Sequence, residues 1–587
     1  MRARVPLTLA MVLVVGATAL AACRPGGGED DSVVVVDRRA TRSPDRVIAP
    51  GPNDGERPRA RRPSIVLVVM DDFSLDLLDT MRSAAAMRRK GASYENAFVV
   101  DSLCCVSRTS LLTGQYPFQT GVRTNTGNMP NPYGPIGGWA AFQAYGNAAR
   151  SFPVRLQRIG YTTGLVGKFI NQYRPVGRSL PRVPPGWDDW QVMFGSAYAG
   201  WNFQSTRIED GRVVLVDHPA PPADASDAEK DAAYAGTVTE RGALGFIREH
   251  RDDKAPYFLE VAPYAPHSMT PGMARTYPGD TLFPPAFRDR PGRGRPEGNC
   301  GRIRCDRLRV DRLVGFHDDQ SDNMPLRADG SPAPDWRPGI GLGADDAVRS
   351  LRGRARMVQS VDRMMARILR AVGPDTFVML TSDNGFHLGQ YGLGRGKSTP
   401  YDPDIRVPLL VTGPGVVPGP RTEMTSNIDL ASTVEDLAGL RPAPYRAGVS
   451  LVPTFTDPGL DRRDHVFVEH TWAPSLGFDP DRWYSGREND AVPSYVAVRT
   501  RHALLVRLDL DDSWEGTDVA WEYYDYRASR FERTNAFADP RHAAEVTRLR
   551  HLLARFVWCR DRAARHPRGA ALPARCAALG GERLTGS

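Results

Sequence analysis

Two pairs of side chains with oxygen ligands each follow an apolar run, and the two runs are far apart in the chain. Asp71 and Asp72 come directly after one run, and Asp383 and Asn384 follow another. Either pair alone is typical of a turn at a strand end. If the pairs meet, their carboxylates repel one another unless a cation lies among them, and oxygen ligands suit a hard divalent cation. Together they predict a metal site.

The positions of lysine are informative because the chain has only five lysines among its 76 basic residues. Lys168 and Lys397 each follow a glycine, where the backbone can approach a ligand closely. A compact ammonium group at both positions suits the binding of an oxyanion. His267 follows a third apolar run, and His387 lies shortly after the second acidic pair. A lone histidine is more often structural than catalytic, and His387 is the weaker candidate.

Cys104 and Cys105 are adjacent in "CCVSRTSLLTGQYP", and Arg108 lies four positions after the first of them. Adjacent cysteines rarely form a disulfide without strain. No second closely spaced cysteine pair with histidines lies nearby in the sequence, which disfavours a zinc site. We therefore expect at least one of the two thiols to serve chemistry. A cation, two lysines, a histidine and Arg108 suit a tetrahedral oxyanion ester, either phosphate or sulfate.

The elements that must position these residues are strands and helices in alternation. Apolar runs of strand length are typical of strands buried on both faces of a parallel sheet, and they occur at 65–70, 255–267, 376–385 and 407–415. Residues 351–373 place their apolar side chains on one helical face. The pattern predicts an α/β fold with a largely parallel central sheet and helices on both faces. Sites in such sheets form at the carboxyl ends of the strands.

The pattern changes from about residue 456. "SYVAVRTRHALLVRL" and "WEYYDY" indicate antiparallel strands, and "AAEVTRLRHLLARFVW" indicates a closing helix. We expect a catalytic domain at 63–455, with a loop-rich insertion at 275–345, followed by a smaller α+β domain at 456–587. The arginines at 282–312 are compatible with a cleft for an anionic polymer, or with a solvated loop.

The ordered motifs resemble those of type I sulfatases, in the alkaline phosphatase superfamily. The signature of that family is Cys-x-Pro-Ser-Arg followed by Leu-Thr-Gly, and this chain has a similar segment from Cys104 to Gly114. "GYTTGLVGKFINQY", "SDNGFHLGQYGLGRGKSTPYDPDIRVPLLV" and "SNIDLASTVEDLAGL" are most similar to the glucosamine-6-sulfatase and heparan endosulfatase branch. The resemblance implies an alkaline-phosphatase-like fold and hydrolysis of a sulfate ester, of a sugar or glycan.

The resemblance also implies roles for individual residues. Cys104 would be oxidised to Cα-formylglycine by a formylglycine-generating enzyme, and the aldehyde hydrate would attack sulfur and then expel sulfate. The implied catalytic residues are Cys104, Arg108, Lys168, His267 and Lys397. The implied metal site, for Ca2+ in the family although Mg2+ also takes oxygen ligands, consists of Asp71, Asp72, Cys104, Asp383 and Asn384. His387 would lie near the leaving group, and Cys105 would be a small buried residue.

Two positions depart from the family pattern. Val106 stands where the signature has proline, in the segment that the converting enzyme reads. Ile170 stands where many sulfatases have a histidine, although the glucosamine-6-sulfatase branch also lacks it. Two alternative functions stay open. One is a phosphodiesterase or phosphonate monoester hydrolase of the same superfamily, and the other is a sulfated-glycan-binding protein in which Cys104 is not converted.

The N-terminal segment predicts export. A basic start, an apolar stretch and the end Leu20-Ala21-Ala22-Cys23 look like a bacterial lipoprotein signal peptide at 1–23; a membrane-spanning helix is the alternative. Lipid on Cys23 would hold the protein on the outer face of the cell membrane, through a flexible tether at 24–62.

The composition bears on the remaining cysteines and on the class of partner. Two local disulfides are the natural pairing in an exported chain, Cys300 with Cys305 and Cys559 with Cys576. The net charge of +8 is modest for 587 residues. No arginine run is interleaved with aromatic residues as in a strand-binding groove, so we expect no nucleic-acid partner.

Overall fold

The computed structural model describes most of the chain after the predicted tether. The described residues are 62–127, 134–270, 272–337, 341–471, 492–511 and 517–564, together with Cys576 and Leu579. The predicted signal peptide with Cys23, and the tether up to residue 61, lie outside the described residues. Among the described helices, none combines the length and the apolar composition that a membrane crossing requires.

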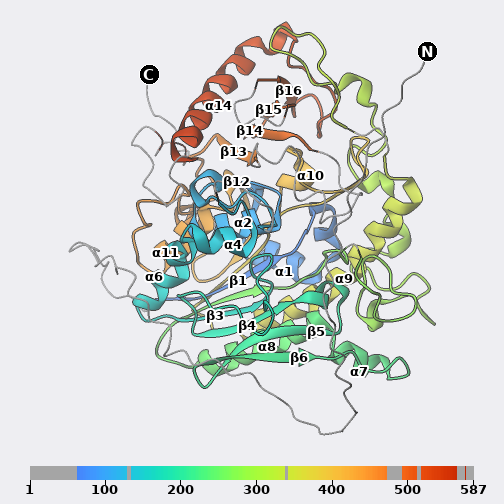
Figure 1. Cartoon of the computed structure of the whole chain (residues 1–587), viewed down its shortest axis with the longest axis vertical. Helices are drawn as coiled ribbons and strands as arrows, with labels where there is room; N and C mark the ends of the chain where they lie inside the picture. The colour runs from blue at the N-terminus through green and yellow to red at the C-terminus, as the bar shows by residue number, and fades with distance from the viewer. Residues whose placement is uncertain are drawn as a thin grey trace, which may run out of the picture. The chain divides into compact units, whose positions relative to one another are not determined.

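A ten-stranded sheet forms the centre of the region before residue 455, in the order β12-β2-β11-β8-β1-β7-β3-β4-β5-β6. Figure 1 labels β1, β3, β4, β5, β6 and β12 of this sheet. Its strands are β1 (Ser64–Met70), β2 (Ala92–Phe98), β3 (Thr162–Gly167), β4 (Asp189–Phe194), β5 (Phe203–Glu209), β6 (Arg212–His218), β7 (Tyr257–Ala262), β8 (Thr376–Ser382), β11 (Leu409–Thr412) and β12 (Gly419–Ser426). The adjacent strands β8, β1, β7, β3 and β4 are mutually parallel. The predicted, largely parallel α/β sheet is confirmed.

One predicted strand runs in the other direction. The apolar run at 407–415 forms β11, which pairs antiparallel with both of its neighbours, β8 and β2. Its apolar residues are buried just as those of a parallel strand are, because burial on both faces depends on position within the sheet and not on direction. The apolar run therefore predicted the strand but not its orientation.

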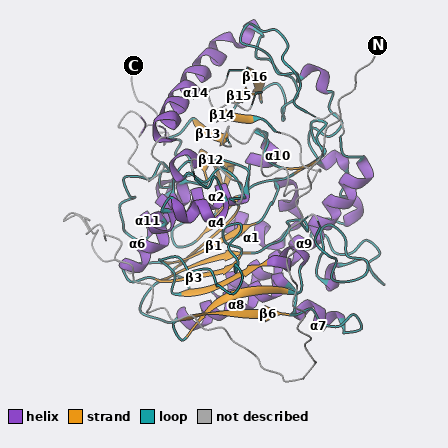
Figure 2. Cartoon of the chain, viewed as in Figure 1, coloured by secondary structure: helices purple, strands orange, loops and turns teal. Residues whose placement is uncertain are grey.

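Helices cover both faces of the sheet (Figure 2). Alternate residues of β1 enter two different cores: Ile65, Leu67 and Val69 enter one, and the residues between them enter the other. The first core is completed by α2 (Cys104–Thr113), α4 (Gly138–Ala144), α6 (Phe152–Arg158) and α11 (Asp429–Leu437). The second is completed by α1 (Arg82–Lys90), α8 (Ala235–His250) and α9 (Ala344–Ala371). Successive side chains of a strand point to opposite faces of the sheet, and here both faces are buried. Every residue from Ile65 to Met70 is therefore apolar.

The long helix α9 begins earlier than the predicted span of 351–373. Asp345 and Asp346 lie in its first turn, where carboxylates stabilise the positive end of the helix dipole. Of the predicted apolar face, Met357 and Ile368 are among the fully buried residues and Leu369 is half-buried. Between β7 and α9 the described residues form loops and short 3-10 turns, and the Cys300–Cys305 disulfide lies in this stretch.

A second sheet of four antiparallel strands follows, in the order β13-β14-β15-β16. The strands are β13 (His465–His470), β14 (Ser494–Thr500), β15 (Ala503–Asp509) and β16 (Val519–Asp525), and α14 (Ala543–Ala564) packs against one face. The Cys559–Cys576 disulfide joins the end of this helix to the following segment. The predicted C-terminal strands and closing helix are thus present, and the domain boundary near residue 455 stays a prediction.

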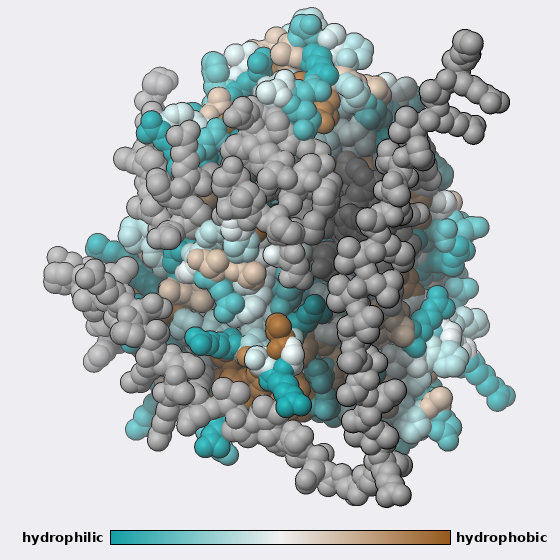
Figure 3. Space-filling view, in the orientation of Figure 1, coloured by the Kyte–Doolittle hydropathy of each residue, from teal (hydrophilic) through white to brown (hydrophobic). Residues whose placement is uncertain are grey.

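The remaining elements are short. They are α3 (Pro117–Thr120), α5 (Asn147–Arg150), α7 (Asp227–Ala232), β9 (His387–Leu388), β10 (Arg395–Gly396), α10 (Asp402–Ile405) and α12 (Val452–Thr456). On the face drawn in Figure 3, hydrophilic and hydrophobic residues of the described part are interspersed. Among the described residues, the large apolar side chains with substantial exposure are Val176, Val314 and Val417.

Candidate active site

The two central strands bring the predicted acidic pairs together. β1 and β8 run parallel and their last residues lie opposite each other. The two segments that follow these strands therefore leave the sheet at the same edge. There the Asp72 amide donates to Asp383 Oδ1 at 3.0 Å, and Asn384 Nδ2 donates to Asp72 Oδ1 at 2.7 Å. These three residues and Asp71 are all buried.

The backbone at Asp72 is held in an uncommon conformation. Its φ is 59°, in the left-handed region that non-glycine residues rarely adopt. The guanidinium of Arg354, fully buried on α9, donates to the carbonyl of Asp72 and to the carbonyl of Phe386 at 3.5 Å. A helix therefore ties together the two loops that carry the acidic pairs, and stabilises a strained backbone at a site residue.

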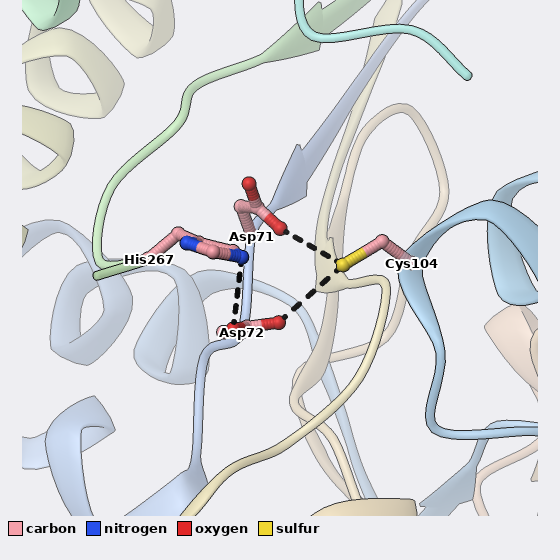
Figure 4. A group of neighbouring side chains, drawn as sticks. All are labelled: Asp71, Asp72, Cys104 and His267. Carbon is pink, nitrogen blue, oxygen red and sulfur yellow. Dashed lines mark hydrogen bonds and ion pairs between the residues drawn. The ribbon is translucent and has the colours of Figure 1, made fainter. Parts of the chain in front are cut away.

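Cys104 is the first residue of α2 and lies directly against the acidic pair (Figure 4). Its Sγ is 3.5 Å from Asp71 Oδ1 and 3.6 Å from Asp72 Oδ1, and Lys397 Nζ donates to it at 2.7 Å. Burial raises the pKa of the Cys104 thiol well above its ordinary value, although two lysines act in the opposite direction. An unmodified thiol here stays protonated and is a weak nucleophile.

The two lysines singled out in the sequence both enter this site. Lys168 Nζ lies 2.7 Å from both carboxylate oxygens of Asp71, and Lys397 Nζ lies 2.6 Å from Asp72 Oδ1. Burial by itself lowers the pKa of Lys168, but its neighbours, Asp71 foremost, together outweigh burial, so the pKa lies well above its ordinary value. The pKa of Lys397 is likewise raised, because its neighbours, Asp72 foremost, together outweigh burial. Both ammonium groups therefore stay charged.

Arg108 reaches the same cluster from the second turn of α2. Its Nε donates to Asp383 Oδ2 at 2.9 Å, and its Nη2 lies 4.0 Å from Asp71 Oδ1. The Nη1 and Nη2 atoms are buried, with no hydrogen-bond partner among the described residues. Neighbouring carboxylates outweigh burial and raise the pKa of Arg108. Arg108 is therefore a fixed cation whose terminal N–H groups can still donate hydrogen bonds to a ligand.

Glu260 is a neighbour that the sequence interpretation missed. It lies on β7, and burial raises its pKa to about 7, with Arg108 acting in the opposite direction. The sequence carries one indication of this neighbour, because Glu260 is a single acidic residue inside the apolar run "YFLEVA". A lone carboxyl group in a central strand indicates a charged partner in the fold.

His267 enters from the loop after β7. Its Nε2 is 3.4 Å from Asp72 Oδ2, and its Nδ1 is 2.6 Å from the Ser268 carbonyl. A carbonyl only accepts, so Nδ1 carries the proton and Nε2 faces the acidic pair. The ring packs against Tyr198, with centroids 4.5 Å apart.

His387 takes a different place from the one predicted for a residue near the leaving group. It is buried on β9, where its Nδ1 lies 3.0 Å from both carboxylate oxygens of Asp404. It pairs with Gly396 of β10, directly before Lys397, and the cavity described below is not lined by it. Its geometry suits holding the strand that presents Lys397.

Several atoms at the acidic edge fit a hard metal ion. Ligand atoms of Asp71, Asp72, Cys104 and His267 lie within 4.8 Å of one another. Asp72 Oδ2 and Asn384 Oδ1 are buried and have no hydrogen-bond partner among the described residues. Buried oxygens are normally satisfied, so this donor set suits a divalent cation that prefers oxygen.

The cluster opens into a cavity of about 430 Å³. This volume lies within the range of about 300–1,000 Å³ usual for small-molecule sites. Among the residues lining it are Cys104, Lys168, His267 and Lys397. Further polar or aromatic lining residues, which the sequence interpretation did not single out, are Asn125, Asn171, Gln172, Arg174, Tyr198, Tyr264 and Arg395. Asn171, Gln172, Tyr264 and Arg395 lie within the predicted strand and family motifs, and Arg174 directly follows one, which was their signal.

The positions that depart from the family pattern lie in or beside the core. Cys105 is fully buried, as expected, and its amide donates to Asn125 Oδ1 at 2.8 Å. Val106 is also fully buried, on the apolar side of α2. Ile170 is buried and lines the cavity. The cavity wall is therefore apolar at this position, where a histidine would make it polar.

Comparison with known proteins gives a consistent result. The family model described as Sulfatase matches residues 63–440. The human N-acetylglucosamine-6-sulfatase is 28% identical over 510 residues, which is 81% of each chain. The Drosophila melanogaster extracellular sulfatase SULF-1 homolog is 27% identical over 434 residues, or 70% of this chain. This chain spans 33% of the length of that relative, and 47% of a similar Caenorhabditis elegans protein.

Solved structures share the fold. A protein solved in complex with its substrate D-glucosamine-2-N,6-O-disulfate superposes with a TM-score of 0.57 at 20% identity, over 87% of this chain and 99% of its own. The phosphonate monoester hydrolase of Silicibacter pomeroyi gives a TM-score of 0.54 at 19% identity, over 86% of this chain and 96% of its own. At such identities the likeness is one of fold alone.

Proposed function

Because the chain belongs to the sulfatase family, we propose that it is a sulfuric ester hydrolase that removes sulfate from a sugar or glycan. The observation that carries this proposal is the convergence on Cys104. Two carboxylates lie within 3.6 Å of its sulfur and the Lys397 ammonium lies 2.7 Å away. Anionic ligands for a metal and fixed cations for an oxyanion thus surround one nucleophile position.

Residue 104 is proposed to act as Cα-formylglycine, produced from the cysteine by a formylglycine-generating enzyme. The hydrate of this aldehyde supplies an oxygen nucleophile and releases sulfate when the aldehyde re-forms. The position suits such a group, since it begins α2, where the helix dipole favours negative charge. The unpartnered N–H groups of Arg108 and the ammonium of Lys168 would hold the hydroxyl groups of the hydrate.

The proposed metal is Ca2+, held by Asp71, Asp72, Asp383 and Asn384 beside residue 104. A divalent ion supplies Lewis acidity at a sulfate oxygen, and Mg2+ offers the same chemistry with oxygen ligands. The two buried oxygens without partners, on Asp72 and Asn384, support this set. Asp383 also accepts from Arg108 at 2.9 Å, so the metal site and the cationic group share a carboxylate.

The remaining cations are proposed to handle the sulfate and the leaving oxygen. Lys168 and Lys397 would neutralise the sulfate oxygens, which gain charge in the transition state. His267 has its Nδ1–H committed to the Ser268 carbonyl, so Nε2 is the atom that would take up a proton and, in the imidazolium form, deliver it to the leaving oxygen. The Lys397 ammonium could deliver a proton in the same way. His387 would act indirectly, by holding the strand before Lys397.

The chemical state of residue 104 is the first test. Mass spectrometry of the peptide that contains Cys104, from protein made in its native host, should show the mass loss of thiol-to-aldehyde conversion. The same preparation should hydrolyse N-acetylglucosamine 6-sulfate. A cysteine found unmodified would refute the proposed nucleophile, because the buried thiol is protonated.

One residue favours a second candidate function. Val106 replaces the proline of the segment read during conversion, and an unconverted chain would keep a cationic pocket that binds sulfated glycans without cleaving them. Glycan binding with residue 104 unmodified would support this second candidate. The fold is also shared with a phosphonate monoester hydrolase, so aryl sulfate and aryl phosphonate substrates should be assayed in parallel. Faster turnover of the phosphonate would favour that activity.

We further propose that the protein is exported and lipid-anchored at Cys23 on the outer face of a bacterial cell membrane. Relatives named as extracellular sulfatases support export, and the apolar segment ending at Cys23 supports the anchor. Cys23→Ser should move the protein from the membrane fraction to the soluble exported fraction. Retention of the variant at the membrane would refute the anchor.

A further inference from the structure

One wall of the cavity carries polar groups that the proposed chemistry does not use. The segment from Lys168 to Arg174 follows β3, and Asn171, Gln172 and Arg174 all line the cavity. Asn171 Oδ1 is buried and has no hydrogen-bond partner among the described residues. Gln172 Oε1 accepts from the Gly127 amide at 2.8 Å, which leaves the NH2 group of this side chain as a donor. An acceptor and a donor are thus present beside the sulfate-handling residues.

The backbone of this segment is fixed before any ligand binds. The Trp139 amide donates to the Asn171 carbonyl at 2.8 Å, and Trp190 Nε1 donates to the Tyr173 hydroxyl at 3.1 Å. The rings of Phe169 and Tyr173 lie 4.9 Å and 5.5 Å from the Trp190 ring in edge-on contacts. Aromatic anchors therefore alternate with the polar residues along the segment. A preformed wall avoids part of the ordering cost of binding.

The cavity has a cation beyond those that the proposed chemistry uses. Lys168 and Lys397 are each paired with a carboxylate, at 2.7 Å and 2.6 Å. Asp72 is the single carboxylate that lines the cavity among the described residues. Arg174 is exposed at the rim, and the structure records no ion pair between it and any described residue. Its positive charge is therefore available to a ligand that already occupies the deep site.

The arginine-rich stretch at 282–312 does not supply this charge. None of its described residues lines the cavity, and some of its arginines are paired with carboxylates elsewhere. Arg288 pairs with Asp231 at 2.5 Å and Arg290 pairs with Asp280 at 2.7 Å. The available cation comes from the segment after Lys168, close to the reacting group.

Resting on the sulfatase function proposed above, we propose that Asn171, Gln172 and Arg174 form a second anion subsite that selects a doubly anionic sulfated sugar. The amide groups bind sugar hydroxyls. The guanidinium binds a further anionic group, either a sulfate on the nitrogen of the same sugar or the carboxylate of a neighbouring uronate. Planar guanidinium groups bind both kinds of anion in a bidentate manner.

The test compares Arg174→Gln with Arg178→Gln. Arg178 lies in the exposed turn between Val176 and Ser179 of the same loop and does not line the cavity, so it is a matched control for net charge. Three substrates are used: N-acetylglucosamine 6-sulfate, D-glucosamine-2-N,6-O-disulfate, and N-acetylglucosamine 6-sulfate linked to a uronate. The first has one anion, and each of the others adds one from a different source.

Arg174→Gln should lower kcat/KM about tenfold on one of the two doubly anionic substrates and leave the singly anionic one nearly unchanged. The substrate that responds identifies the source of the second anion. Arg178→Gln should change none of the three by more than about twofold, as expected for an exposed charge. Equal losses on all three substrates, or no loss on any, would overturn the subsite.

The subsite can fail separately from the proposed activity. If the wild-type protein hydrolyses none of the three sugars, calorimetric binding to Cys104→Ala and to the double variant Cys104→Ala/Arg174→Gln still measures the subsite. Tenfold weaker binding of a doubly anionic sugar by the double variant supports it. Equal binding by the two variants refutes it, whatever the fate of the hydrolase proposal.

Discussion

Two buried clusters of charged residues in this protein differ in how completely they are satisfied. The site cluster, which comprises Asp71, Asp72, Cys104, Arg108, Lys168, His267, Asp383, Asn384 and Lys397, lies at the edge of the central sheet. The tyrosine cluster, which comprises Tyr391, Tyr401, Asp402, Arg499, Glu522, Tyr524, Tyr526 and Glu532, lies where the four-stranded sheet meets the loop after β10. Both are largely buried, although His267 in the first and Asp402 and Tyr526 in the second are half-buried, and both are rich in carboxylates.

In the tyrosine cluster the carboxylates have partners within the protein. Glu532 accepts from the hydroxyls of Tyr391 and Tyr526 and from the Asp402 amide, the last at 2.8 Å. Asp402 accepts from Arg499 Nε at 2.9 Å and from Nη2 at 3.1 Å. No carboxylate oxygen of Asp402, Glu522 or Glu532 is among the buried atoms without a partner in the described part of the chain.

In the site cluster, by contrast, several buried polar atoms have no hydrogen-bond partner among the described residues. They are Asp72 Oδ2, Asn384 Oδ1 and both Nη atoms of Arg108. A buried polar group without a partner costs about 1–3 kcal/mol. Single atoms of this kind also occur away from the cavity, Glu469 Oε2 and Tyr523 Oη among them, but those of the site cluster are gathered where a ligand or metal can complete them. The comparison teaches that residue type does not distinguish a site from a structural network. Buried polar atoms that lack hydrogen-bond partners beside a cavity do distinguish a site from such a network.

The largest expected effect separates two adjacent cysteines. Cys104→Ala should lower sulfate ester hydrolysis by at least about 10⁴-fold, the scale seen when a nucleophile is removed, and should leave the folded state intact. Cys105→Ala is the matched control, since Cys105 is packed in the core beside Asn125. It should keep most of the activity and lose some thermal stability. Activity in Cys104→Ala would contradict the assignment of the nucleophile.

The opposite behaviour is expected in the tyrosine cluster. Asp402→Ala leaves Arg499 buried without its carboxylate, and breaking a buried ion pair in this way costs about 3–5 kcal/mol. Chemical denaturation should show this loss of stability, while kcat/KM of the remaining folded protein stays near the wild-type value. A loss of activity at unchanged stability would show that the tyrosine cluster takes part in catalysis.

Metal removal should act on the site cluster alone. Chelation should lower activity about 10²-fold or more, because a bound cation contributes several kcal/mol to charge stabilisation. Chelation leaves Asp72 Oδ2 and Asn384 Oδ1 without a hydrogen-bond partner among the described residues, so the melting temperature should also fall, while the lysines at 2.6 Å and 2.7 Å keep Asp72 and Asp71 paired. Adding Ca2+ and Mg2+ separately identifies the ion by recovery of activity. Full activity after exhaustive chelation would refute the metal site.

The comparison also shows what the sequence could predict. Asp71, Asp72, Asp383 and Asn384 could be found because each pair ends a continuous apolar run, and a parallel sheet brings such ends to one edge. Lys168 and Lys397 could be found because lysine is rare in this chain. For β11 the apolar run predicted burial but not direction, since a strand buried on both faces looks the same in either orientation.

Other features leave no local signal. The tyrosine cluster joins residues more than a hundred positions apart, as in Tyr391 with Glu532, and "WEYYDY" predicted only strand. Arg354 was part of a predicted helix, but its bond to the Asp72 carbonyl depends on how α9 packs against the sheet. The family resemblance implies that His387 lies near the leaving group, whereas the structure pairs its ring with Asp404. Such contacts are set by tertiary packing.

The smallest expected effect concerns the pH dependence of stability in the tyrosine cluster. Burial, helped by the charge of Asp402, raises the pKa of Glu532 from 4.5 to about 7. Between these values the folded protein binds a proton that the unfolded chain has lost. The contribution of Glu532 to stability is therefore fully present below pH 4.5 and declines as the pH rises towards 7.

Glu532→Gln removes this titration and keeps an acceptor for the two tyrosine hydroxyls. The free energy of unfolding of the wild type should fall, relative to that of the variant, by on the order of 2–3 kcal/mol across this pH range. Denaturant unfolding at several pH values measures the difference between the two curves, and Glu209→Gln, on the exposed end of β5, is the control. Parallel curves for wild type and Glu532→Gln would mean that the tyrosine hydroxyls and the Asp402 amide keep Glu532 ionised. The two buried clusters would then resemble each other in charge and differ only in their access to the cavity.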